Sequence, residues 1–339
     1  MINSELYLKE NIFANPEMAP TRDGFGKGLV EAGDADPRVV ALCADLSEST
    51  RMEAFQKKYP GRFVEVGVAE QNLAALGSGF AAAGKIPFIA SYAAFSPGRN
   101  NEQIRTTISL NHVPVKIIGC HAGVSVGPDG ATHQALEDIA LMRIQPHMTV
   151  ISPCDSEEAR KATLEVAKTS EPVYIRLTRE KTPIMTSAET PFEIGKAQVF
   201  WKPVNNEQII VDRNAVVIFA VGPLVYNALR AAQELEKAEV RATVVNVHTI
   251  KPLDQETIIR EARAAGAALT VEEHQIAGGM GSAIAELLAA NYPIPIEFIG
   301  VHDMFGQSGN PDELIEHYGM GISHIVEAAK KVIGRKQNI

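Results

Sequence analysis

The chain has 339 residues, 45% of them hydrophobic, which is long enough for two domains with sizeable cores. Its 32 lysines and arginines against 41 aspartates and glutamates give a net charge of −9, and no basic tract could follow a nucleic acid backbone. No apolar run reaches the roughly 20 residues of a membrane helix, and residues 1–20 lack a signal-peptide core. Nucleic acid and membrane are therefore not expected as partners.

The three cysteines, Cys43, Cys120 and Cys154, are widely spaced and odd in number, which fits reduced, buried thiols and a cytoplasmic location.

From about residue 21 the chain alternates short apolar runs with amphipathic stretches, which predicts a parallel sheet crossed over by helices. The expected strands are residues 38–46, 63–67, 87–92, 113–121, 148–152 and 173–177. Two intervening segments, 71–83 and 156–168, have helical spacing. These elements predict an α/β domain over residues 21–188, preceded by an N-terminal extension of residues 1–20.

A polar stretch then interrupts the alternation. It contains several prolines and the pair Asn205-Asn206, which predicts a linker over residues 189–212. The alternation resumes in a second domain, residues 213–339. Its expected strands are 215–221, 242–248, 268–273 and 296–301, and its expected helices are 224–235, 256–265, 280–290 and 322–332. The expected fold class is therefore α/β, with two doubly wound sheet domains.

The expected strand at residues 63–67 is followed at once by Glu70, which begins a predicted helix. In parallel α/β sheets, ligands bind at this end of the strands. The alternative interpretation is a first-turn acid that the helix dipole favours, and the motif alone favours that alternative. Tyr92 and Phe95 follow the next strand and could form the wall of a flat heterocycle, although aromatic residues at this spacing are more often core.

The segment from His121 to Gln134 is the strongest candidate for a site, because three glycines, a proline, an acid and two histidines share one strand-to-helix loop. A loop that needs several glycines is usually shaped around something. Weaker candidates follow the first and sixth strands and fall at the same edge of the sheet. They are Asp45, Glu48, Ser49 and Arg179, for which solvated surface polarity is the alternative.

The run Gly127-Pro128-Asp129-Gly130-Ala131-Thr132-His133-Gln134 closely resembles the Asp-Gly-x-Thr-His-Gln loop of transketolases and deoxyxylulose phosphate synthases. Residues 65–72 resemble the family segment whose glutamate contacts thiamine, and residues 92–95 resemble its aromatic wall. Further resemblance to the family's C-terminal domain lies in residues 270–274, 278–282 and 305–309. The resemblance implies a pyrimidine-binding domain at 21–188 and a transketolase C-terminal domain at 213–339.

Thiamine diphosphate is the cofactor that the resemblance implies. Glu70 would be catalytic, bonding the pyrimidine ring nitrogen and favouring the imino form that removes the thiazolium proton. Tyr92 and Phe95 would stack on the pyrimidine, and Asp45 matches a family acid beside the cofactor site.

The resemblance also implies a substrate site for sugar phosphates. His133, a second catalytic residue, and Asp129 would bind the hydroxyl groups of the sugar. The phosphate would be held by Arg22, Ser49, His121 and Arg179, with charge-assisted bonds from the arginines. The implied activity is transfer of a two-carbon ketol unit from a ketose phosphate to an aldose phosphate, as in the pentose phosphate pathway. The run Ser125-Val126-Gly127-Pro128 departs from the more acidic family pattern, which leaves the choice of sugar open.

Full-length family members bind metal and diphosphate through Gly-Asp-Gly followed by an asparagine. The nearest approach here is Gly33-Asp34-Ala35, which lacks the last glycine, and no asparagine lies near residue 60. The resemblance therefore implies that no metal is held by this chain. Mg²⁺ (or Ca²⁺) and the diphosphate would be held by a separate N-terminal transketolase subunit, in an α2β2 assembly.

Three alternatives compete with this interpretation. The beta subunit of a 2-oxo acid dehydrogenase also lacks the diphosphate domain, but that family generally lacks the Asp-Gly-x-Thr-His-Gln loop. A deoxyxylulose phosphate synthase shares the loop but ordinarily carries both halves on one chain. A catalytically lapsed regulatory subunit is the alternative outside the enzymes. It is opposed by the joint presence of Glu70, Phe95, His121, Asp129, His133 and Arg179.

Overall fold

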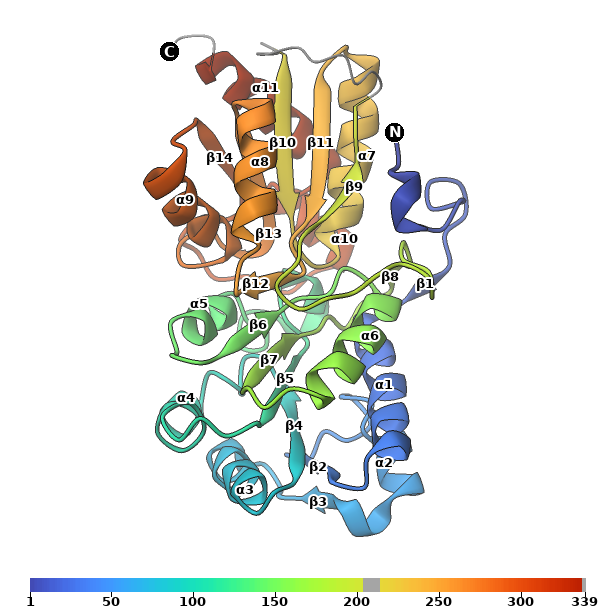
Figure 1. Ribbon diagram of the computed structural model, residues 1–339, viewed down its shortest axis with the longest axis vertical. Helices are drawn as coiled ribbons and strands as arrows, with labels where there is room; N and C mark the ends of the chain where they lie inside the picture. The colour runs from blue at the N-terminus through green and yellow to red at the C-terminus, as the bar shows by residue number, and fades with distance from the viewer. Residues whose placement is uncertain (204–213, 337–339) are drawn as a thin grey trace.

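The computed structural model describes residues 1–203 and 214–336 and arranges them around two sheets, one above the other in Figure 1. The α/β class with two sheet domains is confirmed. Asn205 and Asn206, which mark the expected linker, lie outside the described residues. No helix in the described ranges is long and apolar enough to cross a bilayer.

The first sheet contains the six strands expected from the sequence and one that the sequence did not predict. Its spatial order is β12 (Thr249–Lys251), β6 (Thr149–Ile151), β7 (Val173–Arg176), β5 (Lys116–Cys120), β4 (Ile86–Tyr92), β2 (Val39–Cys43) and β3 (Phe63–Glu65). Neighbouring strands are parallel except for the unpredicted β12, which pairs antiparallel with β6. Short apolar runs form these strands because both faces of the sheet are covered.

Helices cover both faces of this sheet (Figure 1). They are α1 (Thr21–Ala35), α2 (Glu53–Lys58), α3 (Glu70–Ala82), α4 (Asn101–Gln103), α5 (Asp138–Arg143) and α6 (Ser156–Ala167), with the 3-10 helices η2 (Pro60–Arg62) and η4 (Val124–Asp129) and the π-helix η3 (Ile104–Ser109). Phe25 of α1 and Ala159 of α6 pack with Val39 on one face, whereas Leu73 of α3 packs with Val40 on the other. Successive residues of β2 therefore face opposite cores, as the period of a strand requires.

The second sheet has the order β14 (Ile296–Val301), β13 (Ala268–Gln275), β10 (Ala215–Ala220), β11 (Arg241–Asn246) and β9 (Gln198–Trp201). The four expected strands are confirmed and run parallel, while β9 pairs antiparallel with β11. Its helices are α7 (Leu224–Lys237), α8 (Gln255–Ala265), α9 (Met280–Asn291), α10 (Pro311–His317) and α11 (Ile322–Lys336). Because β9 falls within residues 189–212, part of the expected linker belongs to a sheet.

The strand β12, the N-terminal extension and a common core tie the first domain to the second. β12 comes from the second half of the chain but pairs in the first sheet. The N-terminal extension contains η1 (Ser4–Leu6) and β1 (Met18–Ala19), and β1 pairs with β8 (Thr182–Pro183). Asn3 donates its backbone and side-chain N–H groups to carbonyl oxygens of β9, each over 2.9 Å. One apolar core includes Ile89 of the first sheet and Phe219 of the second. The two domains therefore share a core, which fixes their orientation at the site described below.

The three cysteines are free and buried, as expected from their places in or beside strands. Burial raises the pKa of the Cys43 thiol to about 11 and keeps it protonated at neutral pH.

Close packing of α1 against α6 generates a stability prediction. A Cβ atom on Gly24 would lie 1.7 Å from the backbone oxygen of Ser156. We expect Gly24→Ala to separate the helices and to lower the free energy of unfolding by about 1–3 kcal/mol. Thermal unfolding would measure this loss. Gly334→Ala in α11 is the control, since no atom of residues 1–203 or 214–336, its chain neighbours and its own helix backbone aside, lies within 4 Å of its Cβ position. Equal melting temperatures for the two variants would contradict the packing argument.

Candidate functional site

The candidate residues converge at the carboxyl-end edge of the first sheet, where the parallel strands β2, β3, β4, β5 and β7 all end. A carboxylate organises the backbone there. Glu65, the last residue of β3, accepts hydrogen bonds from the backbone N–H groups of Asp45 over 2.7 Å and Gly67 over 3.0 Å. These bonds tie the end of β2 to the turn that leads into α3. Gly67 allows this turn because its φ of 72° suits glycine.

Glu70 begins α3, and its side chain is only 1% exposed. The Nη1 group of Arg99 donates to Glu70 Oε2 over 2.6 Å, and the side chain of Asn100 donates to the Glu70 backbone oxygen over 3.0 Å. The Arg99 guanidinium also lies 5.0 Å from the centre of the Phe95 ring. A first-turn acid that only favours the helix dipole would be expected at the surface, so the burial of Glu70 argues against that alternative.

Four aromatic rings from two separate segments of the chain, each predicted to belong to the site, form one cluster. The Tyr92 and Phe95 rings stack with centroids 5.9 Å apart, and His121 stacks on Tyr92 at 3.9 Å. His133 meets the Phe95 ring edge-on at 5.2 Å, and its Nδ1 lies 2.8 Å from the hydroxyl of Thr132. Tyr92, Phe95 and His133 are partly exposed, so a flat ligand could reach their rings.

Beside Arg22 is a cavity of about 460 Å³, here named the cationic cavity because the basic side chains of its lining (Arg22, Arg51, Arg179 and Lys181) outnumber the acidic ones (Asp23, Glu180 and Asp312). Arg22 donates to the Ser49 backbone oxygen over 2.8 Å and lies 3.2 Å from His121 Nε2. Arg179 donates to the Val126 backbone oxygen over 2.9 Å. The structure thus brings together Arg22, Ser49, His121 and Arg179, as the sequence predicted, although the Ser49 contact is made by its backbone.

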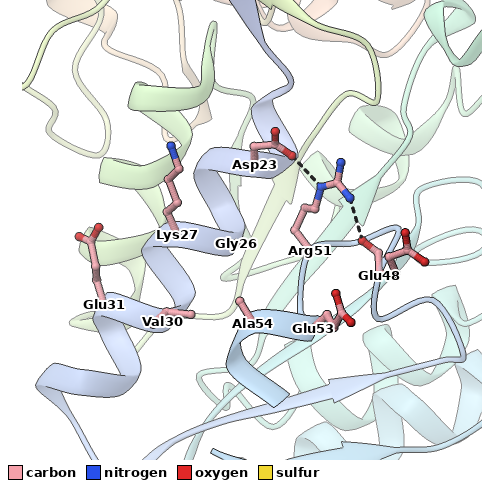
Figure 2. Close-up of a pocket in the computed structure, with 9 residues that line it drawn as sticks. All are labelled: Asp23, Gly26, Lys27, Val30, Glu31, Glu48, Arg51, Glu53 and Ala54. Carbon is pink, nitrogen blue, oxygen red and sulfur yellow. Dashed lines mark hydrogen bonds and ion pairs between the residues drawn. The ribbon is translucent and has the colours of Figure 1, made fainter. Parts of the chain in front are cut away.

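Arg51 is a fifth residue of this region, and the sequence analysis did not identify it. It lines the cationic cavity and also a neighbouring open cavity of about 540 Å³ (Figure 2). Its Nε donates to Asp23 Oδ1 over 2.7 Å and its Nη1 to the Glu48 backbone oxygen over 3.3 Å. Arg51 follows an ordinary polar run, so no sequence signal distinguished it from a solvated arginine.

The arginines and burial together set the charge of His121. Burial, and then the positive charges of Arg22, Arg179 and Arg51, lower the pKa of His121 to about 3. Burial and then Arg51 also lower the pKa of Arg22. Within the described residues, the buried His121 Nδ1 and Arg22 Nε have no hydrogen-bond partner. A neutral imidazole and unpaired polar atoms beside guanidinium groups suit an anionic ligand.

Two predicted carboxylates stand apart from these contacts. Asp45 and Asp129 are exposed, at the end of β2 and at the end of η4, and neither side chain hydrogen-bonds a described residue. Asp129 lies on the segment from His121 to Gln134, here named the site loop, which also carries His133. In residues 1–203 and 214–336 no group of three or more His, Cys, Asp or Glu side chains is arranged to hold a metal ion.

Comparisons with known proteins match both halves of the chain. The family model "Transketolase, pyrimidine binding domain" matches residues 17–185, and "Transketolase, C-terminal domain" matches residues 206–325. A 6-deoxy-6-sulfo-D-fructose transketolase subunit of Clostridium sp. (strain MSTE9) is 39% identical, over 93% of this chain and 95% of the relative. A putative transketolase C-terminal section of Methanocaldococcus jannaschii is 40% identical, over 91% and 96%.

A solved structure described as "Split gene transketolase, inactive beta4 tetramer" is similar in both sequence and fold. It is 41% identical, with a TM-score of 0.85, and the alignment covers 94% of this chain and 99% of that one.

The depressed pKa of His121 predicts how its replacement changes acid stability. The pKa of His121 is near 6.5 in the unfolded chain and about 3 in the folded chain, so between these pH values the side chain takes up a proton when the chain unfolds. The unfolded state therefore gains free energy from protonation, and the stability of the folded state falls as pH falls below 6.5. We expect the stability of the native chain, relative to His121→Gln, to fall by about 1.4 kcal/mol per pH unit between pH 6 and 4. Denaturant unfolding at several pH values measures this difference. Parallel stability curves for the two proteins would contradict the burial of a neutral His121.

Proposed function

We propose that this chain, which belongs to the transketolase family, is the pyrimidine-binding and C-terminal subunit of a split transketolase and serves ketol transfer from a ketose to an aldose. Thiamine diphosphate is the cofactor in this proposal, and the sugars carry a terminal anionic group. The observation that carries the proposal is the buried carboxylate of Glu70 beside the stacked rings of Tyr92 and Phe95. The cytoplasmic location expected from the sequence stays a prediction.

The residues around Glu70 fit an aminopyrimidine ring. Tyr92 and Phe95 are partly exposed aromatic residues, and the Glu70 carboxylate offers a hydrogen-bond partner for a ring nitrogen. Its burial strengthens such a bond, because little water competes for it. When bound, thiamine diphosphate supplies the nucleophilic carbon that takes up the ketol unit. Asp45, at the neighbouring strand end, is proposed to lie beside the cofactor.

Glu70 moves the proton in this proposal. Its Oε2 is held by Arg99 over 2.6 Å, which leaves Oε1 to exchange a proton with the ring nitrogen. Arg99 fixes the orientation of the carboxylate, and Asn100 fixes the backbone at the start of α3. Arg99 also covers the Phe95 ring, so one arginine spans the acid and the stacking surface.

The cationic cavity is proposed to hold the anionic end of the sugar. Arg22, Arg51 and Arg179 line it, and guanidinium groups bind tetrahedral oxyanions through paired, charge-assisted bonds. The Clostridium relative is named for a sulfonated sugar, so a sulfonate as well as a phosphate is a candidate anion. His133 and Asp129 are proposed to bind the hydroxyl groups. Sugars of the pentose phosphate pathway are therefore one candidate substrate class and sulfosugars another.

A separate subunit is proposed to supply the diphosphate site and its Mg²⁺ or Ca²⁺, in an α2β2 assembly. The outward face of α3, the helix that Glu70 begins, is the proposed contact for that subunit, because apolar groups are exposed on it and on the turn before it. Val68 in that turn is 72% exposed, Leu76 on the helix is 37% exposed, and Ala75 is exposed as well. In the part of the chain that the structure describes, no atom beyond the chain neighbours and the backbone of α3 lies within 4 Å of a Cβ position on Gly79 of the same face, although glycine weakens a helix interior. The related split-gene transketolase structure is described as an inactive beta4 tetramer, which supports the need for a partner.

The activity test requires the chain together with its diphosphate-binding partner. Ketol transfer from xylulose phosphate or a sulfonated ketose to an aldose phosphate should appear only when both chains, thiamine diphosphate and Mg²⁺ are present. Glu70→Gln should lower kcat by about 10²–10⁴-fold, because general acid and base contributions are of that size. Glu102→Gln, an exposed acid on α4, is the control. Full activity of the Glu70 variant would exclude the proposed proton transfer.

The α3 contact is tested by a charge on its outward face. Ala75→Glu should weaken binding of the diphosphate-binding subunit by at least about tenfold, because an unpaired carboxylate in an interface is costly to desolvate. Ala289→Glu, which changes another exposed helical alanine, on α9, should bind as the native chain does. Calorimetric titration of one chain into the other gives both affinities. Native affinity for the Ala75 variant would mean that the partner docks elsewhere.

A further inference from the structure

Glycines of the site loop lie against the second domain. Gly123, Gly127 and Gly130 have φ values of 89°, 81° and 71°. A Cβ atom on Gly123 would lie 2.2 Å from the carboxylate of Glu273, and one on Gly130 would lie 2.5 Å from the hydroxyl of Ser308. The loop therefore needs glycine partly because the second domain approaches its backbone so closely.

Hydrogen bonds reinforce this contact. Oε1 of Glu273 accepts from the backbone N–H of Ser125 over 2.6 Å, and the Glu273 residue is 3% exposed. The side chain of Gln134 donates to the backbone oxygens of Val124 and Gln307, each over 3.0 Å. Gln134 thus joins the two ends of the loop to each other and to the second domain. Buried bonds of this kind are costly to lose, because the remaining partner is left unsatisfied.

The same loop carries rings of the site. His121, at its start, stacks on Tyr92, and His133, near its end, meets Phe95 edge-on. A displacement of the loop backbone would therefore move His133 and Asp129 relative to a bound sugar.

We propose that Glu273, with the segment at residues 306–309, positions the site loop, and that the second domain thereby sets the contacts of His133 and Asp129 with the sugar. This inference rests on the proposed function, since it assigns those two residues to sugar binding. Glu273 acts through the backbone of Ser125 and is a positioning residue. The second domain then contributes to substrate binding as well as to assembly.

The neighbouring residue provides a matched control. Glu272 is 1% exposed, but its carboxylate accepts from the backbone N–H groups of Met280 over 2.7 Å and Gly281 over 2.8 Å. Glu272 therefore fixes the start of α9, whereas Glu273 fixes the site loop. Two adjacent carboxylates with the same burial thus support different elements.

Hydrogen exchange of the full-length chain tests the positioning without any activity assay. In Glu273→Ala, the amides of residues 123–134 should exchange about tenfold faster than in the native chain, because Ser125 loses its acceptor. Glu272→Ala should lower the melting temperature too, yet leave exchange in this loop within about twofold of native. Equal loop exchange in Glu273→Ala and the native chain would overturn the proposal, and so would equal acceleration in both variants.

Kinetics of the complex with the diphosphate-binding subunit provide the second readout. Glu273→Ala should raise the KM for the ketose about tenfold while the affinity for thiamine diphosphate is unchanged. Glu273→Gln, which retains an acceptor oxygen, should have a KM close to the native value.

If Glu273→Ala does not fold, Gly306→Ala replaces it. Its Cβ would lie 1.8 Å from Gln134 Oε1 and would displace that side chain from a partly exposed segment. An unchanged KM in the folded variant would overturn the proposal. Absence of ketol transfer by the native complex would instead overturn the proposed function, and the exchange result would stand independently.

Discussion

The buried guanidinium of Arg176 joins the parts on which the site depends. It donates to Asp138 Oδ2 over 2.9 Å, to the Ala135 backbone oxygen over 3.2 Å and to the Glu273 backbone oxygen over 2.7 Å. One side chain on β7 therefore contacts the start of α5, the residue that directly follows the site loop, and β13 of the second domain. Removing one partner of such a buried pair typically costs about 3–5 kcal/mol, because the other charge stays buried without compensation. The site loop is held at one end by this network and along its length by the second domain.

The local charge at the site is opposite in sign to the net charge of the whole chain. The net charge of −9 disfavours approach of an anion in general. Arg22, Arg51 and Arg179 nevertheless line one cavity at the edge of the first sheet. Burial beside these groups keeps His121 neutral, so it offers the ligand a hydrogen bond without adding to the repulsion among the cations. The lining of this cavity therefore carries a small excess of positive charge, four basic side chains against three acidic ones, although the protein as a whole is acidic.

The sequence predicted the parallel strands well, because each is a continuous apolar run bounded by polar residues. It did not predict β9 and β12, which are short edge strands whose pairing depends on segments far away in the chain. In the site, Glu70, Phe95 and His133 could be predicted because they follow parallel strands or lie in the recognisable loop. Arg51, Arg99 and Glu273 could not. Their importance comes from partners 28, 29 and 148 residues away, Asp23, Glu70 and Ser125, and spacing in the sequence does not reveal such contacts.

The glycines show a related difference. In the sequence they indicate a loop shaped around something, and a ligand is the natural candidate. The structure shows that Gly123 and Gly130 accommodate atoms of the second domain.

The pairing of β12 with β6 determines whether the two domains can be separated. Separating them would leave β6 with an unpaired hydrogen-bonding edge and would expose the common apolar core around Phe219. The two domains are therefore not expected to fold as independent units, and a chimaera made with a relative should exchange both domains together.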